Sequence, residues 1–405
     1  MENYLIIADD FTGANDTGVQ VRRRGIEVRV VFSGAQISGG QSAVLDTESR
    51  GLSAEAAAAK ITAGCAAVPF ERFDFVMKKV DSTLRGNIGA EIRSLAECFN
   101  AELIVFAPAL PDLGRTTVDG VHLLNGIPVS QTELARDPKT PVREDNITRL
   151  LRAAFGEPVT HIGAQAVRNN AISLEGGRIF TFDAASNQDM KNIIAAALAE
   201  KKRVLWAGSA AMADNLLALR RSLPPALGIV ASLSSISRAQ IHYAEKKGVA
   251  LVMVPLDEAL EKKHIIDEIT SQARSLLEDG KDVIVLSAST YDASEHGKAE
   301  KAAARSGLSG EQMSEWTARL MGEISLAVLS GMSVSGVLLA GGDTAMSFFG
   351  AAGSEGSSIE TEIATGIPLL RLCGGAFDGL KVVTKAGAFG NEDAIFYGLR
   401  KLREA

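Results

Sequence analysis

Short apolar segments alternate with helical ones along this chain, and this alternation restricts its fold more than any other feature. Tyr4–Ala8 is almost wholly apolar and has the length of a strand buried on both faces of a sheet. Similar strands are expected at 27–32, 42–45, 73–80, 103–109, 159–162, 178–182, 228–232, 250–254 and 282–286. Further strands are expected to begin at 203, 336 and 382; the first turns into a helix by 210, and the other two end in glycine turns. Strands that alternate with helices form parallel sheets with crossover connections. The pattern therefore predicts an α/β fold.

A pair of prolines divides the chain into two parts. The 405 residues are too many for one ordinary core, so two domains are expected. Pro224 and Pro225 stop the preceding helix, and a new alternation of strands and helices begins behind them. We therefore predict a linker at Leu223–Leu227 between domains at 1–223 and 228–405, each with a mainly parallel sheet flanked by helices.

The composition excludes several classes of partner. A formal net charge of −7 and a pI near 5.5 argue against nucleic acid, whose phosphates need a basic face. No apolar run approaches the roughly eighteen residues of a membrane span, and the N-terminus lacks the pattern of a signal peptide. Cys65, Cys98 and Cys373 show no zinc spacing and fit reduced thiols. We expect a soluble cytoplasmic protein.

Charged and hydroxyl side chains follow two strands of the first half. Asp9 and Asp10 come directly after the first strand, and ligands of open α/β sheets bind outside the carboxyl ends of strands. Asp10 can equally be a cap of the next helix, and the sequence leaves both interpretations open. The strand at 73–80 leads into Asp81-Ser-Thr-Leu-Arg-Gly-Asn87 and adds the cations Lys79 and Arg85. Four polar residue types at one strand end favour a binding site.

Glycine-bearing turns follow two strands of the second half. The strand from 336 ends in Gly341-Gly342, and Asp343-Thr344 opens a helix whose N-terminus favours a phosphate. The strand from 382 ends in Lys385-Ala-Gly-Ala-Phe-Gly390. A Gly-x-Gly-x-x-Gly fingerprint does not follow the first strand, which argues against a dehydrogenase. A Walker A sequence is also absent, so a kinase would have to use these glycine turns.

These motifs, in their order along the chain, resemble those of the four-carbon acid sugar kinases, which phosphorylate threonate, erythronate and 3-oxo-tetronate with ATP. The resemblance rests on Ala8–Asp16, on Lys79 with Asp81–Asn87, and on the two glycine turns. A further match involves the long, ordered loop 110–129 and the strand end before it, at Pro108, Pro111, Gly114, Arg115, Asp119, Gly120 and Asn125. His122 lies in that loop and is assigned no role, because a lone histidine is more often structural.

The resemblance implies an acid-sugar-binding domain at 1–223, a nucleotide-binding domain at 228–405, and an active site in the cleft between them. Substrate contacts would fall on Asp10, Arg50, Lys79, Asp81, Ser82, Thr83 and Arg85. ATP contacts would fall on Ser232 or Ser234, Gly341, Gly342, Asp343, Thr344, Lys385, Gly387 and Gly390. The chain departs from the family at Ala231, where a glycine usually precedes the serine pattern.

The implied reaction transfers the γ-phosphoryl group of ATP to the terminal hydroxyl of a sugar acid, which requires positioning and charge neutralisation. Arg85 and Lys79 would bind the substrate carboxylate. Asp10 is the first candidate for the group that accepts the hydroxyl proton, and Asp81 is the second. Mg²⁺ would bridge the phosphates through Asp343 or through waters, and its protein ligands stay unassigned.

The segment Asn15–Gln20 looks more like the D-threonate and D-erythronate kinases than the 3-oxo-tetronate kinases, and D-threonate is favoured. D-erythronate and 3-oxo-tetronate remain alternatives. A non-catalytic sensor of sugar acid or nucleotide is an alternative of another class, although no DNA-binding or receiver module is visible. The expected partners are small molecules, and a homodimer is left open.

Overall fold

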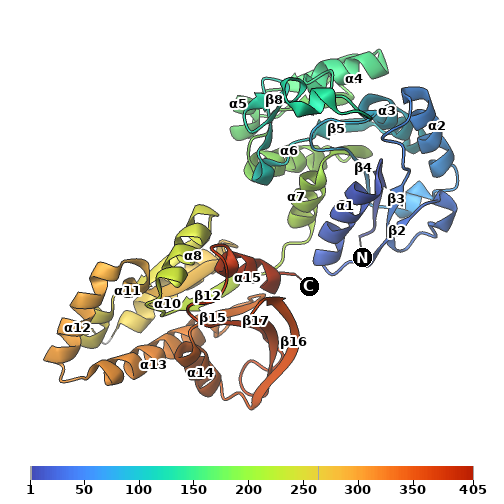
Figure 1. The fold of residues 1–405 in the computed structure, drawn as a ribbon. Coiled ribbons are helices and arrows are strands. Elements are labelled where there is room, and N and C mark those ends of the chain that lie inside the picture. The colour runs from blue at the N-terminus through green and yellow to red at the C-terminus, as the bar shows by residue number, and fades with distance from the viewer. Residues whose placement is uncertain (1, 263, 405) are drawn as a thin grey trace. The chain divides into compact units, whose positions relative to one another are not determined.

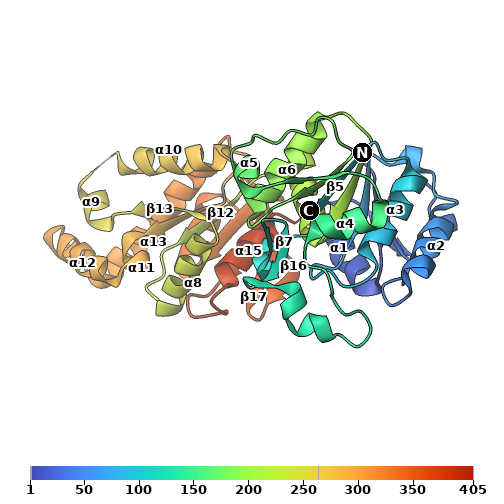
Figure 2. The same ribbon diagram turned by 90° about the horizontal axis from the view of Figure 1, so that it is seen from above.

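The computed structural model describes residues 2–262 and 264–404, and the chain separates into two compact units. The first unit is Met1–Ser222 and the second is Leu223–Ala405. The first is coloured blue to green and the second yellow to red in Figure 1 and, from above, in Figure 2. Each is a mainly parallel sheet with helices on both faces, which confirms the predicted fold class.

Every strand pair of the large sheet in unit 1 is parallel, in the described part of the chain. In spatial order the strands are β2 (Val28–Val31), β3 (Ser42–Asp46), β1 (Tyr4–Ala8), β4 (Phe75–Lys79), β11 (Val204–Gly208), β5 (Leu103–Ala107), β10 (Ile179–Phe182) and β9 (Val159–Ile162). The carboxyl ends of β3, β1 and β4 therefore lie side by side at one edge of the sheet.

Helices cover both faces of this sheet because alternate strand residues point to opposite sides. One face packs against α1 (Phe11–Arg23), α5 (Ala164–Arg168), α6 (Asn187–Ala199) and α7 (Ala210–Arg220). The other packs against α2 (Ala54–Cys65), α3 (Ile88–Phe99) and α4 (Ile147–Phe155). Short 3₁₀ turns occur at Gly34–Gln36, Phe70–Arg72, Pro111–Leu113, Val129–Gln131, Glu133–Arg136 and, in unit 2, Ala293–Glu295.

The expected loop 110–129 contains a small antiparallel sheet instead. Its strands are β6 (Arg115–Val118), β7 (Val121–Leu124) and β8 (Ile127–Pro128). Asp119-Gly120 and Asn125-Gly126 connect them, and all four residues have positive φ. Asp-Gly and Asn-Gly are the favoured pairs of tight hairpin turns, so the signal was present in the sequence.

The sheet of unit 2 is parallel except at one edge. In spatial order it comprises β13 (Ala250–Val254), β14 (Val283–Ser287), β12 (Ala226–Val230), β15 (Gly336–Ala340), β18 (Lys381–Lys385), β17 (Ile367–Cys373) and β16 (Gly356–Ala364). The antiparallel hairpin β16–β17 was not predicted. The predicted linker Leu223–Leu227 was wrong in its second half, because Ala226 and Leu227 are fully buried in β12.

Helices also line both faces of the second sheet. One face packs against α8 (Ser235–Lys246) and α15 (Ala394–Leu402). The other packs against α9 (Leu256–Glu261), α10 (Ile265–Glu278), α12 (His296–Arg305), α13 (Gly310–Leu329) and α14 (Gly342–Ala351), and α11 (Ala288–Tyr291) follows β14. Within the described residues, none of the helices has the length and apolar character needed to cross a membrane.

Candidate functional site

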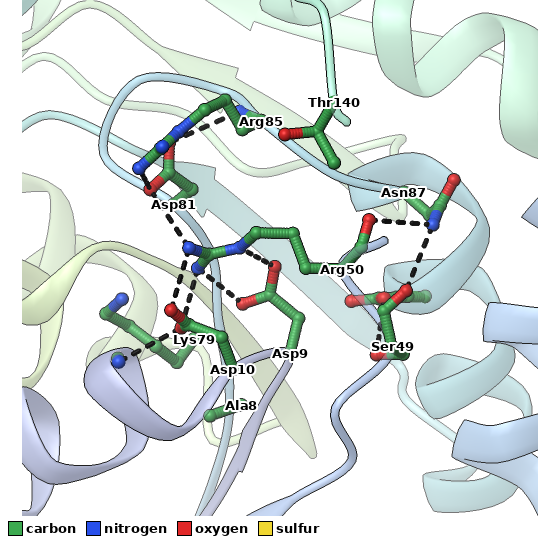
Figure 3. A network of polar contacts seen from close by, with 12 residues as sticks. Ala8, Asp9, Asp10, Ser49, Arg50, Lys79, Asp81, Arg85, Asn87 and Thr140 are labelled. Carbon is green, nitrogen blue, oxygen red and sulfur yellow. Dashed lines mark hydrogen bonds and ion pairs between the residues drawn. The ribbon is translucent and has the colours of Figure 1, made fainter. Parts of the chain in front are cut away.

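Charged side chains from three neighbouring strand exits meet at the carboxyl edge of the first sheet (Figure 3). Asp9 and Asp10 follow β1, Arg50 follows β3, and Asp81 and Arg85 follow β4. Lys79 is the last residue of β4. These six residues are called the charge cluster below. Three carboxylates and three cations balance one another in formal charge.

Arg50 occupies the centre of the charge cluster. Its guanidinium donates to both carboxylate oxygens of Asp9, at 2.7 and 3.0 Å, and to both of Asp10, at 2.8 and 2.7 Å. Its Nη1 also lies 3.6 Å from Oδ1 of Asp81. Such bidentate, charge-assisted bonds are among the strongest in proteins. Burial acts to lower the pKa of Arg50, but the hydrogen bond and charge of Asp9 raise it, so the guanidinium stays protonated.

The loop after β4 is organised by Asp81. Its carboxylate accepts two bonds from the Arg85 guanidinium, at 3.0 and 2.8 Å, and further bonds from the backbone N–H and the hydroxyl of Thr83. Burial acts to raise the pKa of Asp81, but these bonds and the charge of Arg50 hold it well below its usual range. Gly86 has φ +93°, and a side chain there would crowd Arg50 and Asp9. The glycine therefore allows the two strand exits to approach.

Lys79 differs from the other cations of the charge cluster in its pairing within the part of the chain that the structure describes. Its side chain is only 5% exposed, and no hydrogen bond or ion pair within residues 2–262 and 264–404 involves its Nζ. Burial lowers the pKa of Lys79, while the charges of Asp9, Asp81 and Asp10 act to raise it. Figure 3 shows the side chain beside Asp10. A buried cation without a bound anion is suited to receive one from a ligand.

A second layer of polar contacts supports the charge cluster from the opposite face of the sheet. Lys78 is fully buried and its Nζ lies 2.9 Å from Oε2 of Glu91 on α3. The other oxygen of Glu91 accepts from the hydroxyl of Ser49 at 2.7 Å. Asn87 donates to the carbonyls of Ser49 and Leu52, at 3.2 and 2.9 Å, and thereby holds the segment that carries Arg50. Sequence reasoning missed these contacts.

The predicted substrate residues are brought together by the fold. The list is Asp10, Arg50, Lys79, Asp81, Ser82, Thr83 and Arg85, all from the exits of β1, β3 and β4. Asp10 caps α1, since its side chain accepts from the N–H of Gly13 at 3.0 Å, which confirms the capping interpretation, while its role toward a ligand stays a prediction. The roles of all seven residues toward a ligand stay predictions.

The two candidate proton acceptors are both engaged in ion pairs. Asp10 faces Arg50, and Asp81 faces Arg85. The bonds from Arg85 and Thr83 hold the pKa of Asp81 below its usual range and occupy its oxygens, so Asp81 is a weak proton acceptor. The side chain of Asp10 is 22% exposed and that of Asp81 is 9% exposed, so Asp10 is also the more accessible of the two.

In unit 2, a cavity of about 360 Å³ gathers most of the predicted nucleotide residues. Gly341, Gly342, Asp343, Thr344, Ser232 and Gly387 line it. Gly341 precedes α14 with φ +114°, and no side chain caps the helix, so N–H groups of its first turn are available to an anion. Sequence reasoning missed the apolar part of the wall, formed by Leu256, Ala299, Met313 and Ala318. Such a wall suits a base or another flat apolar group.

Lys385, Ser234 and Gly390 do not line this cavity. The Nζ of Lys385 donates to the carbonyls of Ala386, Gly387 and Phe389, at 2.9, 3.0 and 3.0 Å. These bonds from Lys385 hold the glycine turn that follows β18 in place. Ser234 caps α8, and the direct contact of these three residues with a nucleotide stays a prediction.

No three His, Cys, Asp or Glu side chains gather into a metal site in the part of the chain that the structure describes. Asp343 is exposed in the first turn of α14 and lines the cavity. Its carboxylate is the oxygen ligand type that Mg²⁺ prefers, and Mg²⁺ usually keeps several waters and phosphate oxygens as its other ligands. Asp343 is therefore suited to bind Mg²⁺ together with the phosphate oxygens of a nucleotide.

Comparison with known proteins matches both units to described domains. A sugar-binding N-terminal domain matches residues 4–216, and a nucleotide-binding C-terminal domain matches residues 227–395. A crystal structure of a Bordetella bronchiseptica protein containing a domain of unknown function, with bound citrate and as a domain-swapped dimer, covers 99% of this chain and 98% of its own. It has a TM-score of 0.64 and 28% identity.

Known enzymes match this chain along nearly their whole length. The D-threonate kinase of Salmonella typhimurium is 34% identical over 97% of both chains. The D-erythronate kinase of Heliobacterium modesticaldum is 28% identical over 97% of this chain and 95% of its own. Together with the two domain matches, these similarities show that the chain belongs to the four-carbon acid sugar kinase family.

Proposed function

We propose that this protein transfers the γ-phosphoryl group of ATP to the terminal hydroxyl of a four-carbon sugar acid, with D-threonate as the favoured substrate. Unit 1 would hold the acid and unit 2 the nucleotide. The observation that carries the proposal is the buried ammonium of Lys79 at the junction of three strand exits, which forms no ion pair within residues 2–262 and 264–404. The other charged side chains of the charge cluster pair with one another, whereas the ammonium of Lys79 can pair with an anionic substrate.

The residues have distinct roles in this proposal. Lys79 and Arg85 would bind the substrate carboxylate, and Arg50 would hold Asp9 and Asp10 in fixed orientations. Asp10 would accept a hydrogen bond from the attacking hydroxyl and later its proton. Phosphoryl transfer through a loose transition state needs little basicity, so an ion-paired aspartate is sufficient.

The nucleotide would bind in the cavity of unit 2. Its phosphates would lie at the first turn of α14, where backbone N–H groups and the helix dipole favour negative charge. Its base would lie on the apolar wall that includes Leu256 and Met313. Mg²⁺, when bound with the nucleotide, neutralises charge on the transferred group.

A turnover screen tests the proposal. Purified full-length protein, ATP and Mg²⁺ are incubated with D-threonate, D-erythronate, 3-oxo-tetronate and L-threonate, and ADP release is measured. We expect the highest kcat/KM with D-threonate. A higher kcat/KM with D-erythronate or 3-oxo-tetronate would mean that this acid, and not D-threonate, is the substrate. Binding of acid and ATP without ADP release would indicate a sensor.

A further inference from the structure

The imidazole of His122 on β7 lies against the loop that carries Asp81 and Arg85. It is fully buried, with Nε2 2.9 Å from the carbonyl oxygen of Ser82 and Nδ1 3.0 Å from Oγ1 of Thr117. A carbonyl oxygen can only accept, so Nε2 carries the proton and donates to Ser82. The Nδ1 atom then accepts from the Thr117 hydroxyl.

The surroundings of His122 keep the ring neutral. Burial lowers its pKa to about 4, although the bond to Ser82 and the charge of Asp81 act to raise it and the charge of Arg115 acts to lower it. The backbone N–H of His122 donates to the carbonyl of Asp145 at 2.8 Å, which ties β7 to the segment before α4. The ring is therefore held in one place and in one tautomer.

The loop that His122 contacts has an unfavourable backbone conformation. Leu84 is a buried, non-glycine residue with φ +64°, and Gly86 follows with φ +93°. Side chains with a Cβ adopt this region only where the surrounding structure requires it. From inside the loop, Asp81 accepts from the N–H groups of Thr83 and Arg85, at 3.1 and 3.3 Å. His122 adds a bond from a separate element, 40 residues away in sequence.

We propose that His122 is a positioning residue of the acid site. Its Nε2–H fixes the carbonyl of Ser82, and this bond holds the Asp81–Gly86 loop in the strained conformation that presents Arg85 and Asp81 to the acid. The inference rests on the proposed function of the charge cluster. A histidine that only filled space could be exchanged for any side chain of similar volume, whereas a positioning histidine requires a donor at the place of Nε2.

The variants His122→Gln and His122→Asn separate these roles in the full-length protein. The glutamine amide nitrogen reaches the place of Nε2, but the asparagine nitrogen lies nearer that of Nδ1. Loss of a neutral hydrogen bond corresponds to roughly a tenfold effect. We expect H122N to lower kcat/KM for D-threonate by about that factor, mainly through KM, with an unchanged KM for ATP. H122Q should retain most of the wild-type value.

The matched control is His161→Gln, which changes a histidine of the same unit that contacts Thr181 and Asp183 and does not contact Ser82. It should leave the KM for D-threonate within about twofold of wild type, a change smaller than the loss of one neutral hydrogen bond. Wild-type kinetics for H122N, or equal losses in H122N and H122Q, would overturn the inference.

Two NMR measurements on the same proteins need no turnover. The ¹⁵N spectrum of wild-type His122 should show a protonated Nε2 and an unprotonated Nδ1 that do not change between pH 5 and 8. Hydrogen exchange at the amides of Thr83 and Arg85 should be faster in H122N than in H122Q. A ring that is protonated at Nδ1, or that titrates near pH 6.5, would contradict the inference. Absence of turnover in the wild type would instead refute the proposed function.

Discussion

The pairing of Arg50 determines what the other charges of the acid site can do. Because Arg50 already binds both oxygens of Asp9 and Asp10, these carboxylates are fixed in orientation before any ligand arrives. Asp81 is held in the same way by Arg85. Lys79 alone among the cluster cations keeps its charge free of an ion pair, within the residues that the structure describes. The three carboxylates of the site are thus held in place by arginines, and the ammonium of Lys79 can bind an anionic ligand.

The first prediction concerns Arg85. Its guanidinium forms two parallel bonds with Asp81, and a lysine would keep the charge but lose this geometry. One charge-assisted bond contributes about 1.5–3 kcal/mol, so kcat/KM for the sugar acid should fall roughly ten- to a hundredfold in Arg85→Lys. The KM for ATP should not change. Steady-state kinetics with both substrates gives these values.

Arg93→Lys is the control for this prediction, because Arg93 forms an exposed pair with Glu97 on α3, away from the cluster contacts. Such pairs contribute little, and its kinetics should match the wild type. If R85K also had wild-type kinetics for the acid, the acid site would have to lie elsewhere.

The second prediction concerns the pH dependence of stability. His122 binds a proton near pH 6.5 in the unfolded chain but only at about pH 4 in the folded one, because it is buried. Its contribution to stability is therefore complete above pH 6.5 and is lost as the pH falls from 6.5 to 4. Between pH 7 and 4, the wild type should lose about 3 kcal/mol more unfolding free energy than H122Q.

Urea unfolding followed by fluorescence measures this difference. Trp206 is buried in β11 of unit 1, and a Trp316→Phe background removes the tryptophan of unit 2, so the signal reports unit 1. Parallel pH profiles for the wild type and H122Q would mean that His122 titrates normally in the folded protein.

At the scale of elements, the positions of the strand exits could be predicted from the sequence, but the contacts between them could not. Apolar runs located β1, β4 and β15, and parallel pairing then placed their ends at one edge of each sheet. The pairing of Arg50 with Asp9 joins residues 41 apart, and no local pattern encodes it. The contact of His122 with Ser82 joins residues 40 apart and was missed for the same reason.

Some missed features did have a signal in the sequence. Asp119-Gly120 and Asn125-Gly126 mark the turns of β6–β8, within the segment predicted to be a loop. Strand alternation also implies that Lys78 and Lys79 point to opposite faces, so only one of them can join the charge cluster. Lys78 accordingly pairs with Glu91 on α3.

The third prediction concerns the first turn of α14. Apart from its chain neighbours and the backbone of α14, a Cβ at Gly342 would meet no atom of the described residues within 4 Å, and Gly342 lines the cavity of unit 2. Gly342→Val should therefore leave the fold intact and fill the space next to the helix N-terminus, so that ATP binding is lost. Calorimetric titration with ATP measures the affinity.

Gly350→Val is the matched control, since a side chain at Gly350 on the same helix also meets no atom within 4 Å, and Gly350 does not line the cavity. It should bind ATP as the wild type does. Unchanged ATP affinity in G342V would show that the phosphates do not bind at α14.

At the scale of the whole molecule, each unit has its own cores, so each is expected to fold alone. The fourth prediction follows from this division. Residues 1–223, expressed alone, should bind the sugar acid weakly and should not bind ATP, because all cluster residues precede Pro224. NMR titration of the fragment decides, and ATP binding to it would contradict the assignment of roles to the two units. The interdomain cleft and the homodimer stay predictions.

The position of the new phosphate tests the central claim most directly. Wild-type protein is incubated with D-threonate, ATP and Mg²⁺, and the product is observed by proton-coupled ³¹P NMR. Transfer to the terminal hydroxyl predicts ADP and a phosphomonoester signal split into a triplet by the neighbouring CH₂ protons. A doublet would place the phosphate on an internal hydroxyl, and the absence of any phosphomonoester would contradict the proposed kinase activity on this acid.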